Sequence, residues 1–456
     1  MSDPLNSAAF LALLAEAQHE LDLGFAHLPD NPVAPLGPEA TAVLAEAATR
    51  LHDNYPYAHP LYAGQMLKPP HPIARAAYAM AMSINPNNHA LDGGRASSAM
   101  ELEVIAQIAA MFGFPQQHLG HLTSSGTIAN LEALWVAGLT HPGKAVAASS
   151  QAHYTHTRIS AVLGIPFVPI PVDDTNRIDL AKLEILLQTK NIGTVVATLG
   201  TTATGSVDPL DELLVLQQKY GFRIHVDGAY GGYFTLANNL QPAARRAYDA
   251  IPHANSIVVD PHKHGLQPYG CGCVLFRDPT VGRFYKHDSP FTYFTSGALH
   301  LGEISLECSR AGASAVALWT TQRLFPLVPG GKFGQGLSQG REAALTLCTR
   351  IAESPLFFAP THAPQLDIVF WAAAAATPAA SSELAQKIFD EAAKINLHLA
   401  LARLSVTLFE PGTWPDNAES TVLCLRSVLM KPEHLLWIER IWTLLQAAGS
   451  TATEAS

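Results

Sequence analysis

The sequence predicts an α/β protein with a mostly parallel central sheet covered by helices, followed by a small C-terminal α+β domain. Short runs between residues 145 and 278 are apolar throughout rather than alternately, as in strands buried on both faces. Helical patterns at 180–190 and 208–221 separate several of them. Strand, helix and strand in this order indicate parallel pairing. The runs are AVAASS, PFVPIPVD, TVVATLGTT, RIHVDGAYG, SIVVDPHK and GCVLFRD.

Three regions follow from the pattern along the chain. Residues 1–95 contain helical stretches broken by proline-rich turns, such as PDNPVAPLGPEA. Residues 96–345 alternate helical and strand periods, beginning with a helical spacing of apolar residues over 99–112. Residues 346–456 form a shorter mixed region. We therefore predict an N-terminal helical segment, a large domain and a small C-terminal domain with these bounds.

Composition excludes several classes of protein. Of the 456 residues, 48% are apolar and 14% charged, which excludes a disordered chain. The net charge is −10 and no Lys/Arg run occurs, so a nucleic-acid partner is not expected. The five cysteines lack the spacing of a disulfide framework or metal knuckle. The N-terminus lacks a basic signal-peptide region, and the longest apolar tract, 368–376, is too short to span a bilayer. A soluble, cytoplasmic protein is expected.

Two charged residues at strand ends point to covalent chemistry. Lys263, in DPHKHG, ends an apolar run, and a buried ammonium is costly unless it is paired or neutralised. An imine with an aldehyde would neutralise it. Asp227, in HVDGAYGG, needs a cationic partner, and a protonated pyridine nitrogen would serve. The alternatives are a lysine reaching to the surface and a turn-forming aspartate.

A hydroxyl-rich loop and a histidine add to this pattern. The run 123–127 (TSSGT) precedes a helical segment, where backbone amides and hydroxyls bind an anion or simply cap the helix. His153, in SSQAHYTHTR, has a ring that stacks on another ring. His153 and His156, with His262 and His264, could instead bind a metal, but no acidic or thiolate partners accompany them. We therefore expect no metal site.

Taken together and in this order, the motifs SSGTIAN, TLGTT, HVDGAYGG and DPHKHG resemble those of the pyridoxal-phosphate-dependent group II amino-acid decarboxylases. That family includes aromatic-amino-acid, glutamate and archaeal tyrosine/aspartate decarboxylases and has fold type I, shared with aspartate aminotransferase. The segment HPLYAGQML is similar to the family's substrate-side segment. The resemblance runs from about His59 to the C-terminal helix.

The resemblance implies a role for each matching residue. Lys263 would hold pyridoxal 5'-phosphate covalently, and Asp227 would pair with its ring nitrogen. His153 and Ala229 would lie on the two faces of the ring, with Thr202 nearby. Further cofactor-binding positions would be Ser125, Gly126, Thr127, Asp260 and His262.

The substrate side is implied in the same way. Gln65 and Lys68 would contact the substrate, and Arg426 would meet its carboxylate, although Arg426 could equally be a surface charge. Tyr293, or alternatively Tyr285, would return a proton to Cα. Two positions depart from the family: Asp260 stands where many members have Asn, and SSGTIAN lacks the commoner Glu before Ala-Asn.

The expected function is decarboxylation of an L-amino acid to its amine and carbon dioxide by a homodimer whose N-terminal helices embrace the partner. The substrate's side chain stays open between acidic and aromatic. A carbon–carbon lyase or aminotransferase on the same fold is an alternative, because orientation at Cα decides which bond breaks. A non-catalytic ligand-binding protein that keeps the fold is the alternative of another class.

Overall fold

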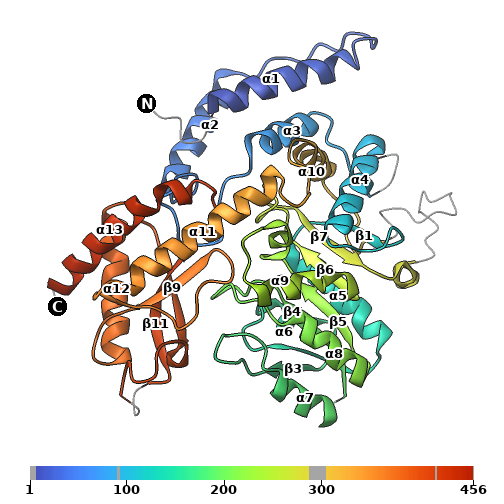
Figure 1. Cartoon of the computed structure of the whole chain (residues 1–456). Helices are drawn as coiled ribbons and strands as arrows, with labels where there is room; N and C mark the ends of the chain where they lie inside the picture. The colour runs from blue at the N-terminus through green and yellow to red at the C-terminus, as the bar shows by residue number, and fades with distance from the viewer. Residues whose placement is uncertain (1–6, 90–92, 190, 287–303, 416–418, 455–456) are drawn as a thin grey trace.

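The computed structural model describes residues 7–89, 93–189, 191–286, 304–415 and 419–454. Its larger sheet has seven strands in the order β1-β7-β6-β5-β4-β2-β3 (Figure 1). The strands are β1 Leu119–Thr123, β2 Ala145–Ser149, β3 Phe167–Ile170, β4 Ile192–Thr198, β5 Arg223–Asp227, β6 Ser256–Val259 and β7 Gly272–Phe276.

Pairing within this sheet confirms the predicted fold class. Strands β3, β2, β4, β5 and β6 pair in parallel, whereas β7 runs antiparallel to both β6 and β1. All six apolar runs form strands. The seventh strand, β1, does not stand out in the sequence, because its central residue is His121. Its partner β7 supplies the pairing that makes it a strand.

Helices cover both faces of the large sheet. Leu134 of α5 and Ile159 of α6 pack with Val146 and Val196 on one face. The neighbouring residue Val195 points to the other face, into the core beneath α4, α7 and α8. The sheet-covering helices are α4 Arg95–Met111, α5 Gly126–Thr140, α6 Thr155–Val162, α7 Leu180–Thr189, α8 Leu210–Tyr220 and α9 Pro242–Asp249.

A separate small antiparallel sheet near the C-terminus has the order β10-β11-β9-β8 and packs against α11, α12 and α13 (Figure 1). The predicted boundary at 345 falls inside α11, which contacts the large domain at one end and the small sheet at the other. These elements are β8 Phe357–Phe358, β9 Ile368–Ala373, β10 Ala400–Ser405, β11 Thr421–Val428, α11 Lys332–Ala352, α12 Pro378–Lys394 and α13 His434–Glu454.

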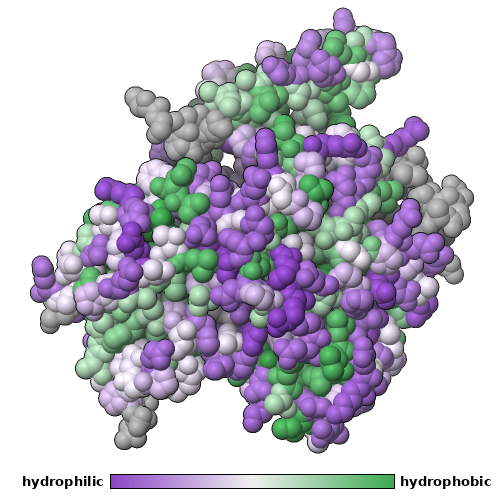
Figure 2. All heavy atoms as spheres, in the orientation of Figure 1, coloured by the Kyte–Doolittle hydropathy of each residue, from purple (hydrophilic) through white to green (hydrophobic). Residues whose placement is uncertain are grey.

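The N-terminal region is helical, as predicted, and lies against α10 at one end of the large domain (Figure 1). Helix α1 packs on α3 and α3 packs on α10, but no residue of α1 or α2 is buried. Leu11, Leu23 and Leu44 stay exposed on these helices, where Figure 2 shows apolar side chains at the surface. The bounds are α1 Ser7–Leu23, α2 Pro38–Arg50, α3 Pro72–Met82 and α10 Gly312–Leu324.

Short 3-10 helices complete the described structure. They are η1 Leu51–Asp53, η3 Gly232–Leu236, η4 Ile251–His253, η5 Pro279–Phe284 and η7 Val406–Leu408. Within the described ranges, none of the helices has the length and apolarity that crossing a bilayer requires.

Candidate active site

Lys263 lies in the turn that follows β6. Its Nζ is 3.0 Å from Asp260 Oδ2, and its side chain is only 24% exposed. Burial alone would lower the pKa of Lys263, but the charges of Asp260 and Asp227 outweigh burial and raise it. The turn therefore presents a cationic amine that is paired rather than isolated, at the carboxyl end of the parallel sheet, where ligands bind in this architecture.

Asp227 is the last residue of β5, the strand next to β6, and is 5% exposed. Its Oδ1 accepts a hydrogen bond from Ala229 N at 3.1 Å, and its Oδ2 lies 2.8 Å from His156 Nε2. Burial alone would raise the pKa of Asp227, but the contact with His156 and the nearby charge of Lys263 lower it well below its ordinary value. Asp227 is thus a buried, ionised carboxylate.

The hydroxyl-rich loop lies between β1 and α5, beside the Lys263 turn. Ser125 is the N-cap of α5, and its Oγ accepts from Ile128 N at 3.3 Å. Gly126 is packed so closely that a Cβ there would lie 2.5 Å from both carboxylate oxygens of Asp260. Thr127 is exposed in the first turn of the helix. This arrangement brings a helix N-terminus, where anions bind favourably, next to Lys263.

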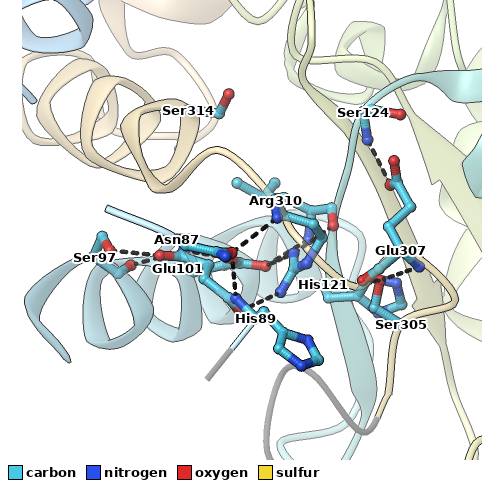
Figure 3. Close-up of polar contacts among 12 residues, drawn as sticks. Asn87, His89, Ser97, Glu101, His121, Ser124, Ser305, Glu307, Arg310 and Ser314 are labelled. Atoms are coloured by element: carbon cyan, nitrogen blue, oxygen red, sulfur yellow. Dashed lines mark hydrogen bonds and ion pairs between the residues drawn. The ribbon is translucent and has the colours of Figure 1, made fainter. Parts of the chain in front are cut away.

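A charged network supports this loop from behind (Figure 3). Arg310 Nη1 lies 2.6 Å from Glu101 Oε1 and also donates to Leu122 O in β1 at 2.7 Å. Glu307 Oε2 accepts from Ser124 N at 2.8 Å (Figure 3). These contacts tie the end of β1 and the start of the loop to residues that follow the large domain's last strand.

His153 lies just before α6, close enough to Asp227 and Lys263 for their charges to act on its ring. Burial lowers the pKa of His153, and these two charges act on it in opposite directions. Its Nδ1 lies 2.5 Å from Thr155 Oγ1, which fixes the ring plane. Ala229 is half-buried two residues after Asp227. The sequence-predicted pair for the two ring faces is thus gathered around Asp227.

His262 and Asp260 form the other side of the Lys263 turn. His262 Nδ1 lies 2.7 Å from Cys271 O, and its Nε2 lies 3.5 Å from Asp260 Oδ2. Burial lowers the pKa of His262, with Asp260 acting in the opposite sense. Cys271 is buried and is a free thiol.

Two of the three predicted substrate contacts lie together. Arg426, on β11 of the small domain, is 3% exposed and donates through Nη1 to Gln65 Oε1 at 3.1 Å. Its Nη2 donates to Thr202 O at 2.7 Å, so the backbone of the predicted Thr202 is also here. Arg426 is therefore not a surface charge. Burial lowers its pKa.

Lys68 has different surroundings. Its Nζ lies 3.4 Å from Met430 O, and it lines a cavity of about 350 Å³ together with Asp367 and Lys431. Burial lowers the pKa of Lys68 to about 8, against the attraction of Asp367. In the described part of the chain, Lys68 makes no hydrogen bond to Gln65 or Arg426.

Of the two tyrosines predicted as proton donors, Tyr293 and Tyr285, the structure describes only Tyr285. Tyr293 lies outside the described residues. Tyr285 is buried, and its hydroxyl donates to Glu132 Oε2 at 3.0 Å. Burial raises the pKa of Tyr285 well above its ordinary value. These contacts give Tyr285 a structural environment rather than one facing Lys263.

Sequence reasoning missed His156 as a partner of Asp227. The spacing His153-x-x-His156 was the available signal, but it fits a metal-binding pair or two structural histidines equally well. Among the described residues, no cluster of three or more His, Cys, Asp or Glu side chains could hold a metal ion.

Comparison with known proteins decides the family. The sequence model of the pyridoxal-dependent decarboxylase conserved domain matches residues 52–373. The chain belongs to this family. An L-tyrosine decarboxylase of Enterococcus faecium is 28% identical over 499 aligned positions, covering 86% of this chain and 81% of that protein. A probable L-tyrosine/L-aspartate decarboxylase of Methanocella arvoryzae is 32% identical over 286 positions, 62% of this chain and 71% of that protein.

Solved structures share the fold of this chain. The structure of Oryza sativa TDC with PLP and tryptamine matches with a TM-score of 0.78 at 17% identity, covering 98% of both chains. Mouse CSAD matches with a TM-score of 0.76 at 19% identity, covering 97% of this chain and 99% of that one. At these identities the likeness shows the fold, which is the predicted fold type I.

The chemistry of the site fits the family's cofactor. This pyridoxal-dependent decarboxylase is a carboxy-lyase that uses pyridoxal phosphate. Its Lys263 turn offers an amine, Asp227 an ionised carboxylate, and the start of α5 a set of amides. Asp260 Oδ1 is buried and has no hydrogen-bond partner in the described part of the chain, so one acceptor beside Lys263 remains to be satisfied.

Proposed function

We propose that this chain decarboxylates an L-amino acid to the corresponding amine and carbon dioxide at the site around Lys263. The observation that supports this most directly is the pair of neighbouring strand ends, with Lys263 after β6 and the ionised Asp227 at the end of β5. The family membership supports the reaction class. A lyase or aminotransferase on the same fold would give an aldehyde or a keto acid instead.

Pyridoxal phosphate, when bound, supplies an aldehyde that takes the substrate's amino group and a ring that accepts the electrons of the broken bond. Lys263 would hold it covalently, and Asp227 would keep a proton on the ring nitrogen because it stays ionised. Ser125, Gly126 and Thr127 would bind the phosphate with the amides of α5, beside His262. His153 and Ala229 would lie on the two ring faces.

The remaining roles concern the substrate. We propose that Arg426, already held by Gln65 and Thr202, orients the substrate carboxylate, since a guanidinium binds a carboxylate through two parallel hydrogen bonds. Tyr293 would return the proton to Cα. Relatives named for tyrosine and aspartate support L-tyrosine and L-aspartate as the first substrates to test. A role for Lys68 with an acidic side chain remains part of this proposal.

The function is tested by two measurements on the purified chain with added pyridoxal phosphate. Borohydride reduction followed by peptide mapping is expected to fix the cofactor on Lys263. A panel of L-amino acids, scored for carbon dioxide and amine, is expected to identify one substrate class. Lys263→Ala should lose both the trapped cofactor and the activity. A colourless wild-type protein that is not labelled at Lys263 would contradict the proposal.

We further propose that the active form is a homodimer in the cytoplasm. The exposed leucines of α1 and α2 support a dimer, because an apolar helix face gains stability when another surface covers it. Light scattering of the purified chain measures the mass in solution and would contradict the proposal if it found only the monomer.

A further inference from the structure

The start of α6 and the residue before its N-cap present two histidines to the same site. His153 lies just before the helix, and His156 N donates to His153 O at 3.1 Å. His156 is fully buried, and its Nε2 lies 2.8 Å from Asp227 Oδ2. One backbone turn therefore fixes the positions of both histidines. His153 is the one expected beside the cofactor ring, and His156 is the one that contacts Asp227.

We infer that His156 is a positioning residue that keeps Asp227 ionised and oriented toward the cofactor's ring nitrogen. The inference rests on the proposed function, because it takes Asp227 as the partner of that nitrogen. In this inference His156 does not touch the cofactor but acts through Asp227, which pairs with the ring nitrogen.

The hydrogen-bond geometry fixes which atom of His156 donates. An ionised carboxylate can only accept, so His156 Nε2 must bear the hydrogen in either charge state of the ring. Oδ1 of Asp227 accepts from Ala229 N at 3.1 Å, so each carboxylate oxygen has one protein donor. A carboxylate 5% exposed without such donors would favour its neutral form, which cannot stabilise a pyridinium.

The layer behind His156 holds it in place. The ring of His225 lies 6.4 Å from the ring of His156, centroid to centroid. His225 Nε2 lies 2.8 Å from Asn130 Oδ1, and Asn130 Nδ2 donates to Gly126 O at 2.9 Å. The residues around Asp227 are therefore linked through α5 to the predicted phosphate loop, so His156 packs against a fixed surface.

The test measures binding of two cofactors to the apoprotein. The probes are pyridoxal phosphate and its 1-deaza analogue, which has a carbon in place of the ring nitrogen. Wild type is expected to bind pyridoxal phosphate more tightly than the analogue, because only the former has a nitrogen for Asp227. His156→Leu is expected to reduce that ratio of dissociation constants by about tenfold, a typical effect of losing one charge-assisted hydrogen bond.

Two polar variants separate a positioning role from simple packing. His156→Gln places an amide nitrogen near the position of Nε2 and is expected to keep the wild-type ratio. His156→Asn places it near Nδ1 and is expected to behave like His156→Leu. Ser160→Ala controls for helix packing. Ser160 is also in α6, its hydroxyl is buried and has no hydrogen-bond partner among the described residues, and the variant should keep the wild-type ratio.

The outcomes distinguish this inference from the proposed function. An unchanged ratio in His156→Leu and His156→Asn would overturn the role of His156 while leaving the proposed function intact. A wild-type protein that binds pyridoxal phosphate but does not discriminate against the analogue would overturn both the role of Asp227 and this inference. A wild-type protein that does not bind pyridoxal phosphate would overturn the proposed function itself.

Discussion

Lys263 lies near two carboxylates that differ in their surroundings. Asp227 has a donor on each oxygen, whereas Asp260 contacts Lys263 through Oδ2 and has no hydrogen-bond partner for Oδ1 in the described part of the chain. Both carboxylates stabilise the ammonium form of the amine. An amine that attacks an aldehyde must first be neutral, so the strength of the contact with Asp260 sets how readily Lys263 reacts.

We predict that Asp260→Asn lowers the pKa of Lys263. The substitution removes the negative charge 3.0 Å from Nζ, while burial, which lowers the pKa, stays the same. A shift of about one unit is expected for the loss of a close charge. Labelling of the apoprotein with an amine-specific reagent at several pH values, followed by mapping of the peptide that contains Lys263, measures this midpoint. Asp249→Asn, on the surface, is the control and should leave it unchanged.

Two of the candidate site residues stand out in the sequence because each follows an apolar run. Lys263 and Asp227 could be predicted because a charge after a buried strand has few explanations. The contact of His156 with Asp227 could not be predicted, because a histidine one turn into a helix has the same pattern whether it binds a carboxylate or packs in a core. Gln65 and Arg426 are 361 residues apart, and only tertiary structure shows that they touch.

At the scale of elements, α5 links several parts of the site. Its N-terminus is the predicted phosphate site, and two turns later Glu132 is fully buried. Glu132 Oε2 lies 2.8 Å from His121 Nε2 in β1 and accepts from Tyr285, which follows η5. Glu132 Oε1 accepts from Leu306 N at 3.3 Å. The carboxylate of Glu132 therefore contacts the residues that come just before and just after the segment 287–303.

We predict that Glu132→Met destabilises the fold by about 2 kcal/mol or more. The substitution keeps much of the side-chain volume but leaves two buried polar groups, the His121 ring and the Tyr285 hydroxyl, without their acceptor. Each buried group left unsatisfied costs roughly 1–3 kcal/mol. Tyr285→Phe removes only one of these contacts and should cost about 1 kcal/mol. Urea unfolding of the three proteins measures both values. Equal losses for the two variants would show that the tyrosine hydroxyl alone accounts for the effect.

The elements themselves were predictable to different degrees. Strands β2 to β7 follow from continuous apolarity, which burial between two helical layers requires. Strand β1, Leu119–Thr123, has a central histidine that pairs with Glu132, so its sequence does not look like a buried strand. The small sheet was expected only as a mixed region, because its antiparallel order depends on pairing between distant segments.

At the scale of the whole molecule, buried titratable groups act in opposite directions on stability. Burial lowers the pKa of His225 and His434 to about 3, from an ordinary value of 6.5. Between these values the unfolded chain binds more protons, so these histidines reduce stability as the pH falls. Burial raises the pKa of Asp208 and Asp367 to about 6, from 3.8. In that window the folded chain binds more protons, and the two acids oppose the loss.

Because these contributions overlap below pH 6, a single substitution is needed to separate them. His434 is fully buried, and its Nδ1 accepts from Lys431 N at 3.2 Å, a bond that protonation of Nδ1 would remove. In His434→Asn the amide oxygen can accept from the same donor but does not titrate. We predict that wild type loses about 2 kcal/mol more stability than His434→Asn between pH 7.5 and pH 5.0. The size follows because pH 5.0 lies about 1.5 units below the unfolded pKa, and each unit is worth about 1.4 kcal/mol.

Urea unfolding of the apoprotein at the two pH values measures this difference directly. The control is His52→Asn, which removes a histidine whose side chain is exposed in the folded chain. Its pH dependence should match that of wild type. If His434→Asn also lost the same stability as wild type, the buried histidine would have to be protonated without cost. That result would mean that the contact between α13 and the Lys431 backbone opens before the rest of the fold.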